Sequence, residues 1–292
     1  CATLPARLGS HRHLLHPATE TRNRRIMNAT LAGIAAALLY TVASAMLGRQ
    51  LLRREKPRAP VIQALGGLAL PLHLISIHAQ IYQPTGLDLG LFHISSLVGW
   101  LIAALAIGMS LYKPIISITV AAFPLAILGL TLSLFAPSTY MPGTLSPGAE
   151  SHILLSILAY SVLTIAAAQA LLVAVQDRHL RTHKQGLMNA LPPLQTMESL
   201  LFSLIGTGFV LLTLAIVTGF LTLNDLFAQH VAHKTVLTLA AWAVFAVLLA
   251  GRHWLGWRGP TAIRFTLWGF ALLLLGFYGS KLVLELVLGR SA

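Results

Sequence analysis

Eight long stretches of the chain are almost free of charged residues, and this pattern limits the possible folds more than any other feature. A bilayer core about 30 Å thick takes roughly 20 apolar helical residues to cross. Each stretch should be helical, because a spanning segment must satisfy its backbone hydrogen bonds internally. Only 10% of the residues are charged and 56% are hydrophobic, which excludes an ordinary soluble domain. The predicted fold is an all-α, polytopic membrane helix bundle with spans at 27–47, 61–82, 91–111, 115–136, 152–176, 200–222, 235–251 and 264–288.

The basic residues, which dominate a formal net charge of +12, lie mainly in alternate connections between these spans. Twelve Lys and Arg residues lie in or at the edges of the first, third, fifth and seventh connections, whereas the other connections between spans hold only Lys234. Cytoplasmic connections of membrane proteins collect Lys and Arg. The asymmetry therefore predicts that both ends of the eight-span core face outward. Because the bilayer explains the charge, we expect no nucleic-acid partner.

The first 26 residues conflict with this orientation, because they contain five arginines and would have to lie outside. Met27 directly opens the first apolar stretch, in MNATLAGIAAALLY. We therefore expect residues 1–26 to be a basic extension, either disordered or upstream of the natural start. Residues 27–289 are expected to form one eight-span membrane domain.

Histidines are the main candidates for function, because ionisable groups inside a bilayer are costly and imidazole readily binds metals and haem iron. His73 lies in the middle of the second predicted span, and His152 opens the fifth. His93, near the start of the third span, and His233, in the loop before the seventh, are weaker candidates. These positions belong to separate helices that a bundle could bring together.

Other kinds of chemistry lack the required residues. Cys1 is the only cysteine, so an internal disulfide and a cysteine-rich metal site are excluded. The sequence has no Walker motif, no HExxH and no GxSxG. No span carries two acidic residues, as many cation-coupled carriers do. We therefore expect a protein that is not an enzyme, and a solute or metal transporter using the buried histidines is the least favoured alternative.

The last hundred residues carry a more specific pattern, in which GWRG at 256–259 is followed by FYGS at 277–280. Together with SHILLSILAY at 151–160, this pattern resembles the cytochrome c assembly family of CcsA, CcmC and HemX-like proteins, in particular its YpjD-like inner-membrane branch. The resemblance covers about residues 27–289. It implies a multi-pass protein of the bacterial plasma (inner) membrane that binds haem and works with cytochrome c maturation proteins.

The same resemblance implies that His73 and His152 are axial ligands of the haem iron. One feature of the family is missing: the loop LNDLFAQHVAHK, at 223–234, has no tryptophan where haem-handling members carry a tryptophan-rich segment. The sequence therefore leaves an alternative open. In it, the chain keeps the fold without haem and is a non-enzymatic partner or regulator of another membrane protein, for example an ion-transport component.

Overall fold

The structure, a computed structural model, describes residues 17–53, 55–84, 86–112, 116–136, 147–181, 192–222 and 232–279. Within them, eight helices are long and apolar enough to cross a membrane, as predicted. They are α1 (Pro17–Leu52), α2 (Ala59–Ile81), α3 (Leu91–Tyr112), α4 (Thr119–Phe135), α5 (Pro147–Arg181), α6 (Leu194–Thr222), α7 (Ala232–Leu255) and α8 (Gly259–Leu274). The 3-10 turn η1 (Ile116–Ile118) precedes α4, and the π-helical turn η2 (Leu275–Gly279) continues α8.

Several helices are longer than the apolar stretches that predicted them. Helix α1 begins at Pro17 rather than at residue 27, so residues 17–26 belong to this helix. Residues 1–16 lie outside the described part, and the expectation that 1–26 precede the natural start stays a prediction. Helix α8 begins at Gly259, with proline in its first turn, rather than at residue 264. The outward orientation of both ends also stays a prediction.

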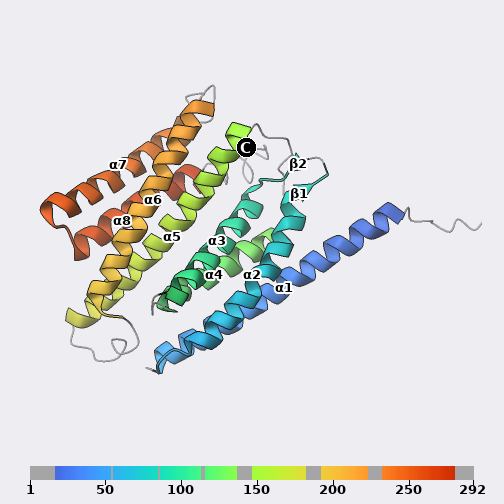
Figure 1. The fold of residues 1–292 in the computed structure, drawn as a ribbon, viewed down its shortest axis with the longest axis horizontal. Coiled ribbons are helices and arrows are strands. Elements are labelled where there is room, and N and C mark those ends of the chain that lie inside the picture. The colour runs from blue at the N-terminus through green and yellow to red at the C-terminus, as the bar shows by residue number, and fades with distance from the viewer. Residues whose placement is uncertain are drawn as a thin grey trace, which may run out of the picture.

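The described residues form two clusters of buried apolar side chains, the first within the N-terminal half and the second mainly within the C-terminal half. Residues from α1 to α4 surround Tyr40 and Phe123, whose rings lie 5.3 Å apart and are fully buried. The second cluster extends through α5 to α8 and also includes residues of α2, α3 and α4, among them Ile77, Ile94 and Ala122. Helix α3 packs against α2 on one side and α5 on the other, and it lies between them in Figure 1. It therefore connects the two halves.

A short hairpin joins α2 to α3 at one end of the bundle. Its strands, β1 (Tyr82–Gln83) and β2 (Gly86–Leu87), are antiparallel, with Tyr82 opposite Leu87. Gly86 takes a φ of 133°, which side-chain-bearing residues rarely adopt. We call this end of the bundle the hairpin end; α3 and α5 both begin there.

The turn between α7 and α8 is tight and lies at the opposite end of the bundle. Gly256 and Gly259 have φ values of 67° and 53°, in the left-handed region that favours glycine. Trp257, between them, packs so closely on Gly251 that a Cβ at that glycine would lie 2.4 Å from the indole ring. The carboxylate of Glu198 on α6 accepts a hydrogen bond from the Gly259 N–H at 2.9 Å. The GWRG segment therefore fixes α8 against α6 and α7.

Candidate functional site: three histidines at helix junctions

His73 is fully buried where α1, α2 and α3 meet. Its Nε2 lies 3.1 Å from the hydroxyl oxygen of Ser96 on α3. The ring of Tyr40 on α1 meets the imidazole edge-on, with 5.8 Å between the ring centroids. The Nδ1 of His73 and the hydroxyl of Tyr40 are buried and have no hydrogen-bond partner among the described residues. His73 is thus held by one polar contact and has one ring nitrogen unsatisfied.

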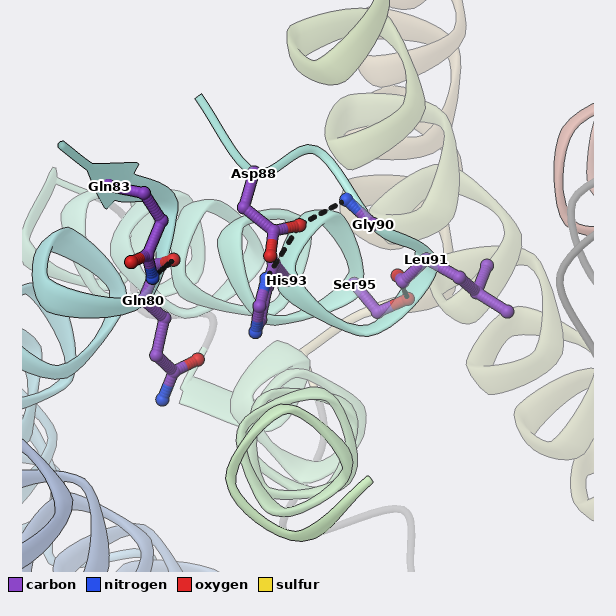
Figure 2. Close-up of polar contacts among 7 residues, drawn as sticks. All are labelled: Gln80, Gln83, Asp88, Gly90, Leu91, His93 and Ser95. Carbon is purple, nitrogen blue, oxygen red and sulfur yellow. Dashed lines mark hydrogen bonds and ion pairs between the residues drawn. The ribbon is translucent and has the colours of Figure 1, made fainter. Parts of the chain in front are cut away.

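His93 lies at the start of α3, beside the loop that follows the hairpin. Its Nδ1 is 3.1 Å from the Oδ1 of Asp88, an ion-pair distance, although the two groups are not aligned as a hydrogen bond. The same carboxylate oxygen accepts a hydrogen bond from the Gly90 N–H at 3.0 Å (Figure 2). A carboxylate beside Nδ1 favours the tautomer with the proton on that nitrogen. The lone pair of the imidazole is then on Nε2.

His152 lies in the second turn of α5 and faces α6. Its Nδ1–H donates to the backbone carbonyl of Ala215 at 2.8 Å, because a carbonyl can only accept. Gly219 lies one turn further along α6, and a Cβ there would be 3.0 Å from the Cε1 of His152. The glycine therefore leaves room for the ring against the α6 backbone. A neutral His152 held in this way carries its lone pair on Nε2, the arrangement usual for histidines that bind metals.

The remaining candidates contribute less. His233 is exposed in the first turn of α7, and His230 lies outside the described residues. Over the described ranges, no group of three or more His, Cys, Asp or Glu residues is arranged to hold a metal ion. His73 contacts α1 and α3, whereas His152 contacts α6, and α3 lies between their helices (Figure 1). None of the contacts described here joins the two histidines, and their action as a pair stays a prediction.

Two partners of these histidines were missed in the sequence. Asp88 is the acid that meets His93, and its signal is a single carboxylate five residues ahead of a histidine at a helix start. Tyr40, the neighbour of His73, gave no signal because it lies among apolar residues of α1. Both contacts depend on which helix faces pack together.

A cavity of about 310 Å³ lies away from the histidines, between α3, α5 and α6. Its lining is mostly apolar and includes Met109, Val162 and Leu204, with Ser203 and Thr207 as polar groups. The α3 residues that line it belong to the end of that helix opposite the hairpin. The cavity is therefore separate from the histidine contacts.

The eight apolar helices, with polar side chains buried where helices meet, define a multi-pass integral membrane protein. Residues 84–288 match the family described as "Cytochrome C assembly protein", and the chain belongs to this family. As an inner-membrane relative also indicates, it is a multi-pass protein of the bacterial plasma membrane.

Relatives extend this match over most of the chain. It is 32% identical over 263 residues to "Inner membrane protein YpjD" of Escherichia coli (strain K12), covering 86% of this chain and 97% of that protein. It is 25% identical over 150 residues to "Cytochrome c biogenesis protein CcsA" of Chlamydomonas reinhardtii, covering 51% of this chain and 42% of that protein. No solved structure shows significant similarity to the chain. Membership of the family supports a role in cytochrome c biogenesis.

Proposed function

We propose that the chain is a haem-binding membrane protein of cytochrome c biogenesis and that His152 is an axial ligand of the haem iron. The proposal rests on family membership and on one observation, the hydrogen bond from His152 Nδ1 to Ala215. That bond fixes the tautomer and the ring orientation, and it leaves Nε2 available to bind iron. Bound haem would supply an iron centre whose axial position an imidazole can fill.

The surroundings of His152 fit a large planar ligand better than those of His73 do. His152 is partly exposed at the start of α5, whereas His73 is fully enclosed by α1 and α3. The Nε2 of His73 is already in contact with Ser96, and Tyr40 covers an edge of the ring. Binding iron through the Nε2 of His73 would require this contact to break. The pairing of His73 with His152 is therefore the less favoured form of the proposal.

His93 is the better second candidate because of its position at the start of α3, although it is also buried. The Asp88 carboxylate lies 3.1 Å from the Nδ1 of His93 without hydrogen-bond alignment, whereas the Ala215 carbonyl accepts a hydrogen bond from the Nδ1 of His152. Both histidines lie near the starts of α3 and α5, which pack against each other. We therefore propose His93 as the second histidine to test.

The experiment is an absorption spectrum of the purified protein after haem loading in mild detergent. We expect a Soret band in the wild type, and its loss or shift in His152→Ala. His179→Ala is the matched control, because His179 is on the same helix and its Nδ1 also meets a backbone carbonyl, at 2.7 Å, but it lies near the other end of that helix. If wild type binds no haem, or if the two variants bind it equally, the proposed ligand is wrong.

The same spectra separate the two pairings. His93→Ala should change the coordination of the bound haem, whereas His73→Ala should leave its spectrum unchanged. The opposite result would support His73 and His152, the pair predicted from the sequence, as the two ligands.

A further inference from the structure

The cavity of about 310 Å³ between α3, α5 and α6 is a groove that opens to the outside of the bundle. Helix α5 packs against both α3 and α6 and lies between them (Figure 1). Val162 and Ile165 of α5 line the groove and are buried, so they form its floor. Thr207 of α6 and Tyr112 of α3 also line it but are exposed. The groove therefore faces the surrounding lipid between α3 and α6.

The groove runs along the bundle, from the end opposite the hairpin toward the middle. Its α3 residues, Leu105, Met109 and Tyr112, follow one another at four- and three-residue steps and so lie on one helix face. Helix α3 rises by about 10 Å between Leu105 and Tyr112. Tyr112 is the last residue of α3 and is 91% exposed. Because tyrosine is enriched where headgroups meet hydrocarbon, Tyr112 marks the level at which the groove begins.

The size and the lining of the groove fit a single hydrocarbon chain. No charged side chain is among the described residues that line it. The hydroxyl of Ser203 already donates to the Ser199 carbonyl at 3.0 Å and needs no partner from a ligand. A volume of about 310 Å³ is too small for a further helix, which is about 10 Å across with its side chains. An acyl chain is thinner and brings no polar group that the groove would leave unsatisfied.

The end of the bundle at which the groove begins is strongly basic. The connections from α1 to α2, α3 to α4, α5 to α6 and α7 to α8 lie at this end, and the twelve Lys and Arg residues counted above lie in or beside them. The acids at the same end are Glu55, Asp177 and Glu198, and Glu198 is bonded to the Gly259 N–H. Clusters of Lys and Arg beside membrane helices attract anionic lipid headgroups.

We propose that this groove binds one acyl chain of an anionic phospholipid, whose headgroup lies beside Tyr112 at the basic end of the bundle. The chain lies on Val162 and Ile165, between Met109 on one side and Leu204 on the other. Apolar contact in the groove and charge at its outer end both contribute to binding. The site contains none of the histidines and requires no haem, so it stands independently of the proposed iron ligand.

A photoactivatable lipid tests where the chain lies. The full chain is placed in nanodiscs that contain phosphatidylglycerol with a diazirine on one acyl chain, then irradiated and digested, and the labelled residues are mapped by mass spectrometry. Val162 and Ile165 should be labelled although both are buried, whereas Phe245, which is buried between α7 and α8, should not. Labelling of the two α5 residues no greater than that of Phe245 would overturn the proposal.

A pair of tryptophan variants tests the groove by lipid retention. The detergent-purified chain is mixed with phosphatidylglycerol or with phosphatidylcholine of the same acyl chains, and native mass spectrometry counts the bound lipids. Wild type should retain one phosphatidylglycerol several-fold better than phosphatidylcholine, and Thr207→Trp, which fills the groove, should lower this retention several-fold. Thr41→Trp is the matched control, because Thr41 is an exposed threonine on α1 that does not line the groove.

Each outcome of the retention experiment bears on one part of the proposal. Equal retention of phosphatidylglycerol by Thr207→Trp and Thr41→Trp would contradict the groove as the site. Equal retention of the two lipids by wild type would contradict the anionic headgroup. If Thr207→Trp does not fold, the labelling of Val162 and Ile165 in the wild type still decides.

Discussion

Replacing Gly219 with alanine should displace His152 and destabilise the α5–α6 pair. The added Cβ would lie 3.0 Å from the Cε1 of His152 and 3.1 Å from its Nδ1, closer than ordinary van der Waals contact. The ring cannot move away freely, because its Nδ1–H is bonded to the Ala215 carbonyl on the same helix as the new methyl group. The strain therefore acts on the hydrogen bond that fixes the tautomer of His152.

The magnitude follows from three contributions. Overpacking a closely packed site costs about 1–3 kcal/mol, and weakening one hydrogen bond costs about 0.5–1.5 kcal/mol. Alanine in place of a helix-interior glycine returns about 1 kcal/mol of helix propensity. The free energy of unfolding should therefore fall by about 0.5–3.5 kcal/mol in Gly219→Ala.

Gly206→Ala is the control, since Gly206 is also on α6 but a Cβ there would meet nothing within 4 Å. It should stabilise the protein slightly or leave it unchanged. Thermal unfolding in detergent, followed by circular dichroism, measures the difference, and 1 kcal/mol corresponds to roughly 2–4 °C in a protein of this size. Equal midpoints for the two variants would refute the steric reasoning. In the haem-loaded protein, Gly219→Ala should also shift the Soret band if His152 binds iron.

Three further substitutions test other contacts by the same unfolding measurement. Gly129→Ala should destabilise the protein by about 1–3 kcal/mol, because the added Cβ would lie 2.5 Å from the backbone oxygen of Ser95 on α3. An unchanged midpoint of thermal unfolding would show that α3 and α4 can separate. Trp100→Phe should lower the free energy of unfolding by about 0.5–1.5 kcal/mol, because it removes the hydrogen bond from the indole N–H to the Leu70 carbonyl. An unchanged free energy would mean that water replaces the indole N–H as the donor. Glu198→Ala should lower the free energy of unfolding by about 1 kcal/mol, since the Gly259 N–H loses its acceptor. Glu198→Asp should recover part of this loss only if its shorter side chain still reaches the Gly259 N–H.

The spans could be predicted from sequence because about 20 consecutive apolar residues have few alternatives to a membrane helix. The helix ends could not be predicted as well. Apolar content marks the part inside the bilayer, but the helical hydrogen bonds of α5 continue through charged residues to Arg181. Helix α8 begins before Arg264, and Pro260 in its first turn was the available signal. Proline is favoured there because its missing N–H has no helical partner.

The candidate site was harder to predict, since contacts across helices depend on their faces and register. The central position of His73 suggested burial, and the structure confirms it. Ser96, the side chain that contacts it, is one of many serines in the chain, and nothing in the sequence distinguishes it. The hairpin was also missed, although Pro84 and Gly86 are residues typical of a turn.

The two apolar clusters also bear on the order in which the protein can assemble as it is synthesised. The first cluster, around Phe123, draws only on residues up to Leu134, so all its packing partners exist before α5 is made. The second includes Ile94 and Val98 of α3 as well as Leu163 and Phe245, so its formation uses a surface that the first half supplies. The second cluster therefore depends on residues of the first half, whereas the first cluster does not depend on residues of the second half. The packing contacts of the first cluster can form before α5 is made, whereas the second cluster is complete only with residues of α2, α3 and α4 already in place.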